Sequence, residues 1–266
     1  MDKADLLAIF ERDQRINVQF PGMIHEVVGR VIRHRSPQEH SGFIAYSTLD
    51  EASANAEIDA QVAFFSALGL PFEWKVYDHD RPADLRQRLA ARGFVIEDPE
   101  ALLVLDMDNA PDFYESMVVP DAVERVTTPV GIDGIVRMEE EVWQTPHERL
   151  GERLASDLEN LPDLVSIYAV QADGRTVSAA WVYYHPPSQF ASLWGGSTLP
   201  AYRGRGYYTA LLVARAREAR RRGYRFLTVD ASPMSRPILE KRGFQFLGFS
   251  TPCQWSPPQA KEEHDG

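Results

Sequence analysis

The sequence predicts an α/β (α+β) protein with two similar domains, each a mixed, mostly antiparallel sheet flanked by helices. Three observations lead to this fold class. A glycine-rich turn joins an apolar extended segment to an arginine- and alanine-rich helix near Gly206. A hairpin signal precedes that turn, and a strand, a short helix and a further strand follow it. A similar order of elements also occurs in the first half of the chain, 150 residues earlier.

The glycine-rich turn is the most informative stretch of the sequence. The segment Phe190 to Leu199 is extended, Pro200 interrupts it, and Arg203 to Gly206 forms a tight basic turn. Helix formers then run from Thr209 to Arg222. The first N–H groups of a helix lack intrahelical partners, and the helix dipole favours an anion there. Glycines let a phosphate approach the backbone, so this turn predicts phosphate binding.

The charge around the turn differs from that of the chain as a whole. Residues Ala201 to Arg225 contain eight arginines and one glutamate, whereas the formal net charge of the chain is −11. Arg220 to Arg222 are explained as cations at a helix C-terminus, which leaves Arg203 and Arg205 as candidates for a ligand. Neither a P-loop nor a Gly-x-Gly-x-x-Gly dinucleotide motif is present, which argues against kinase-like and NAD-dependent enzymes.

The turn Arg203 to Tyr208, Arg-x-x-Gly-x-Tyr, resembles motif A of the GNAT superfamily, Arg/Gln-x-x-Gly-x-Gly/Ala, and departs from it at Tyr208. A predicted strand at Tyr224 to Ala231, a Glu-Lys-Arg-Gly-Phe sequence ending at Phe244 and a strand at Gln245 to Phe249 extend the resemblance. It implies an N-acetyltransferase that moves an acetyl group from acetyl-CoA to an unidentified amine by direct attack in a ternary complex. The alternative is a non-catalytic CoA-binding or partner-binding module.

The resemblance also implies the site residues. Gly196, on the strand before the turn, is the predicted oxyanion donor and the one residue assigned to catalysis. The predicted coenzyme-binding residues are Gly196, Thr198, Leu199, Arg203, Gly204, Arg205, Gly206, Tyr207, Tyr208, Thr209 and Ser232. The positions of the superfamily's usual base and acid are occupied by Ser192 and Leu239, which leaves both roles open. Candidate replacements are Tyr183, Tyr184, His185, Tyr207 and Tyr208.

The segment ahead of the turn predicts the acceptor side. The predicted elements are a strand at Val123 to Val126, helices at Ile132 to Trp143 and Glu148 to Glu159, and a hairpin of Leu164 to Gln171 and Thr176 to His185 through Asp173-Gly174. By resemblance, the two helices cover the acceptor site. Consecutive acids Glu139, Glu140 and Glu141 suit a cationic amine, but such residues point in different directions on a helix. The preferred interpretation is a solvated surface.

The first half of the chain predicts a diverged copy of the second. The predicted elements are a helix at Ala4 to Val18, a strand within Met23 to Arg35, a strand at Ser41 to Leu49, a helix at Asp50 to Leu68, a strand at Phe72 to Tyr77, a helix at Pro82 to Arg92, and strands at Val95 and Ala101 to Met107. Asp50 and Glu51 stand where a pyrophosphate would bind, and Asp50 is predicted as a helix N-cap. The expected domains are a degenerate copy at 1–110, a linker at 111–120 and an acetyl-CoA-binding domain at 121–266.

Composition excludes several classes of protein. No run of about 18 apolar residues predicts a membrane span, and the N-terminus resembles no secretory signal, so a cytoplasmic protein without membrane partners is expected. The single cysteine, Cys253, permits no internal disulfide, and the seven histidines show no metal-ligand spacing, so no metal is expected. A pI near 5.1 argues against nucleic acid as a partner. The oligomeric state and the length of the acyl chain stay open.

Overall fold

The computed structural model describes residues 1–36 and 41–258. The chain forms two compact units, and neither is a continuous segment. The first unit contains Met1–Leu102, Asp230–Pro233 and the chain from Leu247 onward, and the second contains Leu103–Val229 and Met234–Phe246. The predicted domains 1–110 and 121–266 are continuous by contrast. A strand pattern in a sequence indicates a strand without indicating the sheet it joins, which is why such an exchange of segments is not visible in sequence.

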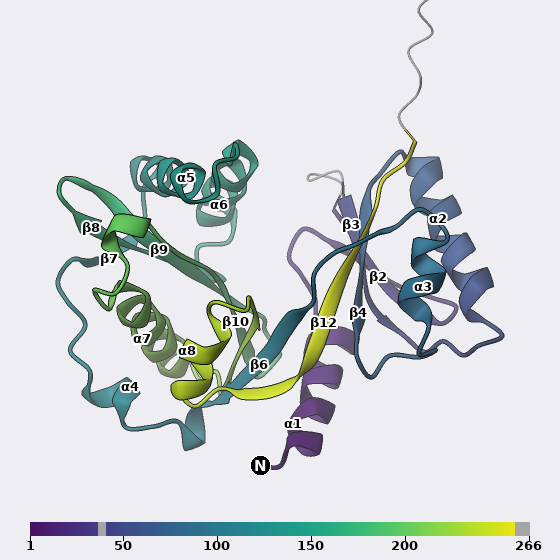
Figure 1. The fold of residues 1–266 in the computed structure, drawn as a ribbon, viewed down its shortest axis with the longest axis horizontal. Coiled ribbons are helices and arrows are strands. Elements are labelled where there is room, and N and C mark those ends of the chain that lie inside the picture. The colour runs from purple at the N-terminus through teal and green to yellow at the C-terminus, as the bar shows by residue number, and fades with distance from the viewer. Residues whose placement is uncertain (37–40, 259–266) are drawn as a thin grey trace, which may run out of the picture. The chain divides into compact units, whose positions relative to one another are not determined.

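The second unit contains a sheet with helices packed against it. Its elements are α4 (Phe113–Ser116), β7 (Val123–Val126), α5 (Pro129–Trp143), α6 (Glu148–Asn160), β8 (Val165–Ala172), β9 (Arg175–Tyr184), β10 (Phe190–Thr198), α7 (Tyr207–Arg221), β11 (Phe226–Ala231, whose last two residues belong to the first unit) and α8 (Arg236–Lys241). The strands run in the order β7-β8-β9-β10-β11, antiparallel except for the parallel pair β10 and β11. Helices α5 and α6 lie on one side of β8 and β9, and α7 lies on the other (Figure 1). This confirms the predicted fold class.

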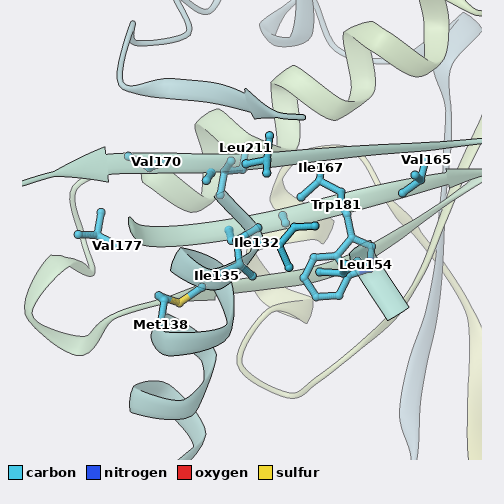
Figure 2. Close-up of a cluster of buried hydrophobic side chains, with 14 of the residues drawn as sticks. Ile132, Ile135, Met138, Leu154, Val165, Ile167, Val170, Val177, Trp181 and Leu211 are labelled. Carbon is cyan, nitrogen blue, oxygen red and sulfur yellow. The ribbon is translucent and has the colours of Figure 1, made fainter. Parts of the chain in front are cut away.

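A hydrophobic core fixes α5 and α6 on this sheet. Ile132, Ile135 and Met138 repeat at three-residue spacing and form the buried stripe of α5. Figure 2 shows this stripe facing the strands, with the Trp181 ring beside Leu154 of α6. Complete burial stabilises each such side chain by about 1.5–3 kcal/mol. The packing holds the C-terminal turn of α5 near the end of β10, because α5 contacts both β9 and β10.

The first unit repeats the strand, helix and parallel strand of the second. Its elements are α1 (Lys3–Phe10), the π-helix η1 (Glu11–Ile16), β1 (Ile24–Val28), β2 (Val31–Ser36), β3 (Ser41–Ser47), α2 (Ala54–Leu68), β4 (Phe72–Tyr77), α3 (Leu85–Ala90) and β5 (Val95–Ile96). Two further strands, β6 (Glu100–Asp106) and β12 (Gln245–Trp255), run from one unit into the other. Strands β3 and β4 are parallel and joined by α2, as β10 and β11 are joined by α7. Both helices end at a glycine with positive φ, Gly69 and Gly223.

The junction between β3 and α2 corrects one prediction. The sequence predicts a helix from Asp50, whereas α2 begins at Ala54 with Ser53 as its N-cap. The Asp50 carboxylate accepts hydrogen bonds from the backbone N–H groups of Ala52 at 3.1 Å and Ser53 at 2.8 Å. An aspartate that bonds its own backbone two and three residues on closes a turn, which delays the helix. These N–H groups are therefore already satisfied within the protein.

The last strand corrects a second prediction. The sequence predicts a strand that ends at Phe249, but β12 continues to Trp255. Residues Ser250 to Trp255 pair with β4 of the first unit in antiparallel register. Pro252 explains the error, because a proline inside an apolar run argues against a strand unless its missing N–H is not needed.

Cys253 lies in this part of β12, and its side chain is completely buried. Burial raises the pKa of the Cys253 thiol to about 12, so the thiolate fraction at neutral pH is very small. We expect a thiol reagent such as dithionitrobenzoate to leave native protein unmodified at pH 8 and to titrate one thiol per chain in denaturant. A rapid stoichiometric reaction of native protein would contradict this prediction.

No helix in the described ranges is long and apolar enough to cross a membrane. Residues 1–36 and 41–258 also contain no group of three or more His, Cys, Asp or Glu side chains suited to a metal ion.

Candidate functional site

A β-bulge in β10 forms the centre of the candidate site. Gly195 and Gly196 have φ values of 69° and 96°, and the register with β9 shifts between Gly195 and Ser197. On the other edge, the parallel pairing of β10 with β11 ends at Ser192 and Thr228. A bulge leaves its extra residue outside the hydrogen-bond ladder. Gly196, the predicted oxyanion donor, is therefore the residue of β10 that has no opposite partner on β9.

Aromatic rings press against both glycines of this bulge. A Cβ atom added to Gly195 would lie 2.5 Å from the Trp181 ring, and one added to Gly196 would lie 2.9 Å from the Tyr208 ring. Tyr208 belongs to the first turn of α7, so the residue that departs from motif A packs directly on the bulge. The Tyr208 hydroxyl is hydrogen-bonded to Ser235, and burial raises its pKa. Only glycine fits at positions 195 and 196.

The predicted phosphate loop has the conformation that its sequence requires. Gly204 and Gly206 have φ values of 75° and 83°, and a Cβ at either position would meet nothing within 4 Å. Helix α7 begins at Tyr207, and its first backbone bond is from the Ala210 N–H to the Gly206 carbonyl at 2.9 Å. The N–H groups of residues 207–209 therefore point out of the helix end without partners in the described chain. The open space and the free donors suit an anion.

The two arginines of the loop are held by backbone carbonyls. Arg203 Nε donates to the Thr198 carbonyl at 3.1 Å, and Arg205 donates to the Ala201 carbonyl at 3.2 Å. The Arg205 guanidinium also lies over the Tyr202 ring, 4.8 Å from its centroid. Neither arginine forms an ion pair within residues 1–36 and 41–258. Their positive charges are therefore uncompensated at the end of β10.

The other predicted coenzyme residues are arranged differently. The hydroxyl groups of Thr198 and Ser178 are hydrogen-bonded, with their oxygens 2.7 Å apart. Leu199 is buried in the core, its N–H donates to Val177, and its carbonyl accepts from Tyr202. Leu199 therefore shapes the loop and presents no free backbone donor. Ser232 directly follows β11 and is grouped with the first unit. Its role in coenzyme binding stays a prediction.

The position of Glu139 corrects a further prediction. The sequence favours a solvated surface for Glu139 to Glu141, but the Glu139 side chain is buried, with 3% of its surface exposed. Its Oε2 accepts hydrogen bonds from Ser197 Oγ at 2.7 Å and from Trp143 Nε1 at 2.8 Å. Burial raises the pKa of this carboxyl group. The contact with Ser197 places the carboxylate beside the bulge.

Ser192, at the position of the superfamily's usual base, is bonded to a histidine that sequence spacing did not connect with it. His185 Nε2 lies 2.7 Å from Ser192 Oγ, and Trp194 Nε1 donates to the same oxygen at 2.9 Å. Burial lowers the pKa of His185 to about 4, so the imidazole is neutral at pH 7 and can accept the serine proton. The short connection between the two predicted strands was an available signal. Antiparallel pairing of β9 and β10 across it brings His185 and Ser192 close together.

Comparison with known proteins agrees with this geometry. Residues 132–244 match the model of the Acetyltransferase (GNAT) family. A GCN5-related N-acetyltransferase from Kribbella flavida is 15% identical, with 97% of this chain and 95% of that chain covered and a TM-score of 0.63. The chain has the GNAT fold. A functionally unknown conserved protein from Staphylococcus epidermidis ATCC 12228 is 11% identical, with coverages of 91% and 95% and a TM-score of 0.65.

A further structure with the GNAT fold is a tandem GNAT protein from the clavulanic acid biosynthesis pathway, 14% identical, with coverages of 91% and 85% and a TM-score of 0.56. A sequence comparison with curated proteins gives no match. At these identities the solved structures establish the fold, and the residues that carry the chemistry have to be argued from this chain. The family match covers α5 to α8, which includes both the bulge and the glycine loop.

Proposed function

We propose that this protein is an N-acetyltransferase that transfers an acetyl group from acetyl-CoA to an amine. The observation that carries the proposal is the set of unpartnered backbone N–H groups at the start of α7, next to two glycines with open space around them. These donors, with Arg203 and Arg205, would hold the coenzyme's pyrophosphate. The positive charge here contrasts with the net charge of −11 of the whole chain.

The bulge in β10 would receive the thioester. In the proposed reaction the amine attacks the thioester carbonyl within a ternary complex, so that the C–N bond forms, the C–S bond breaks and the amine loses a proton. Negative charge develops on the carbonyl oxygen, and the Gly196 N–H would stabilise it. The departing thiolate of CoA takes up a proton to become the free thiol.

We also propose a tandem arrangement in which 121–266 binds acetyl-CoA and 1–110 is a degenerate copy that does not. The junction between β3 and α2 has no glycine, and the Asp50 carboxylate occupies the N–H groups of Ala52 and Ser53. A carboxylate at that position would also repel a phosphate. The description of a structural neighbour as a tandem GNAT protein supports this arrangement.

One observation favours a second function, a CoA-binding module without catalysis. Leu239, where many relatives carry a tyrosine acid, is buried in α8 and has no proton to donate. Isothermal titration of acetyl-CoA and release of free thiol with a panel of primary amines separate the possibilities. We expect binding in the range of about 1 µM to 1 mM and thiol release that depends on the amine. Failure to bind acetyl-CoA would refute both functions, and binding without thiol release would favour the module.

A further inference from the structure

Burial of the Glu139 carboxylate is energetically unfavourable. Glu139 is buried at the C-terminal end of α5, with 3% of its surface exposed. Its Oε2 has two donors, but its Oε1 is buried without a hydrogen-bond partner in the described part of the chain. A buried carboxylate oxygen without a hydrogen-bond partner destabilises the folded state. An apolar residue would avoid this cost, so the unpaired Oε1 points to a ligand.

The hydrogen bonds to Oε2 fix the orientation of the Glu139 carboxylate, and therefore also the position of Oε1. Ser197 Oγ and Trp143 Nε1 both donate to Oε2, and Trp143 Nε1 also lies 3.3 Å from Ser197 Oγ. Ser197 is the residue directly after Gly196 on β10, so the carboxylate is fixed beside the backbone that would bind the thioester. Hydrogen bonds such as those from Ser197 and Trp143 hold a functional group in one orientation.

The charges around Glu139 do not neutralise it. His147, at the start of α6, is the group whose charge acts on the Glu139 carboxyl, and it lowers the pKa less than burial raises it. On β9, Arg175 pairs with Glu141, and Tyr183 donates to Asp157 of α6. Tyr184 donates to Ser166, the charge of Arg153 on α6 acts on Asp157, and β10 contributes the neutral Ser197. Within the described residues, no cation therefore forms an ion pair with Glu139.

The surroundings of the carboxylate suit an ammonium group. Trp143, which donates to Glu139, has 60% of its surface exposed, and Trp194, two residues before Gly196, has 48% exposed. Indole faces attract cations. A carboxylate beside an exposed indole is an arrangement that binds alkylammonium ions.

We propose that Glu139 Oε1 binds the ammonium form of a cationic acceptor amine and accepts its proton during transfer. This assignment depends on the proposed acetyltransferase function and deepens it by naming the substrate class and the base. The ammonium group first gives one proton to Oε1, and the neutral nitrogen then forms the C–N bond. The C–S bond breaks with its electron pair on sulfur, and the second nitrogen proton goes to the thiolate to give the free thiol of CoA. The competing base is the neutral pair of Ser192 on β10 and His185, which follows β9.

The test compares Glu139→Gln with Glu141→Gln in acetylation of a panel of primary amines that includes 2-phenylethylamine. The glutamine side chain in Glu139→Gln keeps an oxygen for Ser197 and Trp143 but cannot accept a proton. We expect this variant to lower kcat/KM about 100-fold or more and to leave the dissociation constant of acetyl-CoA within about twofold, as measured by titration. Glu141, an exposed residue paired with Arg175, provides the matched control and should keep wild-type activity.

The pH profile distinguishes a base from a structural residue. Glu139 must be ionised to accept a proton, so wild-type kcat/KM should rise with pH through the pKa of this group, which burial places above the ordinary value. That acidic limb should be absent in Glu139→Gln. Ser197→Ala removes a hydrogen bond that lowers the Glu139 pKa, so it should move the limb to higher pH. Ser197→Ala tests the proposal even where Glu139→Gln does not fold.

The outcomes separate this inference from the proposed function. A wild-type protein that acetylates no amine defeats the proposed function itself. Wild-type turnover together with full activity and an unchanged acidic limb in Glu139→Gln overturns the role of Glu139 alone and favours His185. Folding is checked by thermal unfolding at pH 8. Because the folded state raises the Glu139 pKa, ionisation there lowers stability as pH rises, so Glu139→Gln should melt no lower than wild type.

Discussion

Replacing Gly206 by aspartate is expected to raise the dissociation constant of acetyl-CoA at least about 100-fold, a loss of about 2.7 kcal/mol. Gly206 is the N-cap of α7, with φ of 83° and open space where a Cβ would be. The aspartate side chain would enter that space, bond the N–H groups of the first helical turn and repel the pyrophosphate. Isothermal titration with acetyl-CoA measures the effect.

Two controls separate charge from backbone strain in this experiment. Gly206→Asn has nearly the same shape, and asparagine tolerates positive φ best among non-glycine residues, so it should weaken binding by only about tenfold. Gly69→Asp places the same side chain at a glycine with φ of 66° and open space at the end of α2. It should lower stability without changing affinity. Equal affinity of Gly206→Asp and wild type would remove the basis of the proposed coenzyme loop.

The glycine loop could be predicted because its conformation is set locally. Positive φ at Gly204 and Gly206 requires glycine, and a helix begins wherever helix formers follow such a turn. The Asp173-Gly174 hairpin turn is another local signal, and both of its residues have positive φ in the structure. The order of strands and helices around these turns could therefore be predicted from local sequence.

Glu139 and the end of β12 could not be predicted for the opposite reason. Three successive glutamates do not reveal which of them the neighbouring strand will cover, since that depends on how α5 rotates against β10. The partner of Ser250 to Trp255 is β4, which is more than 170 residues away in the chain. Burial of a polar group and choice of a sheet partner are tertiary properties, and neither leaves a periodic pattern.

The two strand-to-helix junctions share a topology but differ in whether their backbone N–H groups have partners. In the first unit, Asp50 supplies the acceptor for the N–H groups that precede α2. In the second, glycine supplies none, and the equivalent donors at the start of α7 have no partner in the described chain. The first arrangement stabilises its turn internally, and the second keeps the donors for a ligand at the expense of local stability. Fold alone therefore does not decide which copy binds a coenzyme.

Replacing Gly196 by alanine is expected to lower kcat by about 100-fold or more while changing the affinity for acetyl-CoA by less than about threefold. Gly196 has φ of 96°, and its new Cβ would lie 2.9 Å from the Tyr208 ring. Strain of about 1–3 kcal/mol would shift the bulge and turn its N–H away from the thioester oxygen. The phosphate loop lies at a different position and keeps its donors. Steady-state kinetics should therefore show the loss of kcat, whereas titration should show a nearly unchanged affinity for acetyl-CoA.

The size of the kcat effect has to be separated from a general loss of stability. Gly93→Ala introduces the same side chain at a φ of 86° with open space around it, so it reproduces the backbone strain away from the site. It should lower the melting temperature and leave kcat unchanged. The double variant Gly196→Ala/Tyr208→Ala removes the ring contact but keeps the strained φ, and recovery of part of the lost kcat would assign that part to the collision with Tyr208. Wild-type kcat in Gly196→Ala would mean that the bulge does not position the oxyanion donor, because a displaced N–H cannot stabilise a charge that it no longer faces.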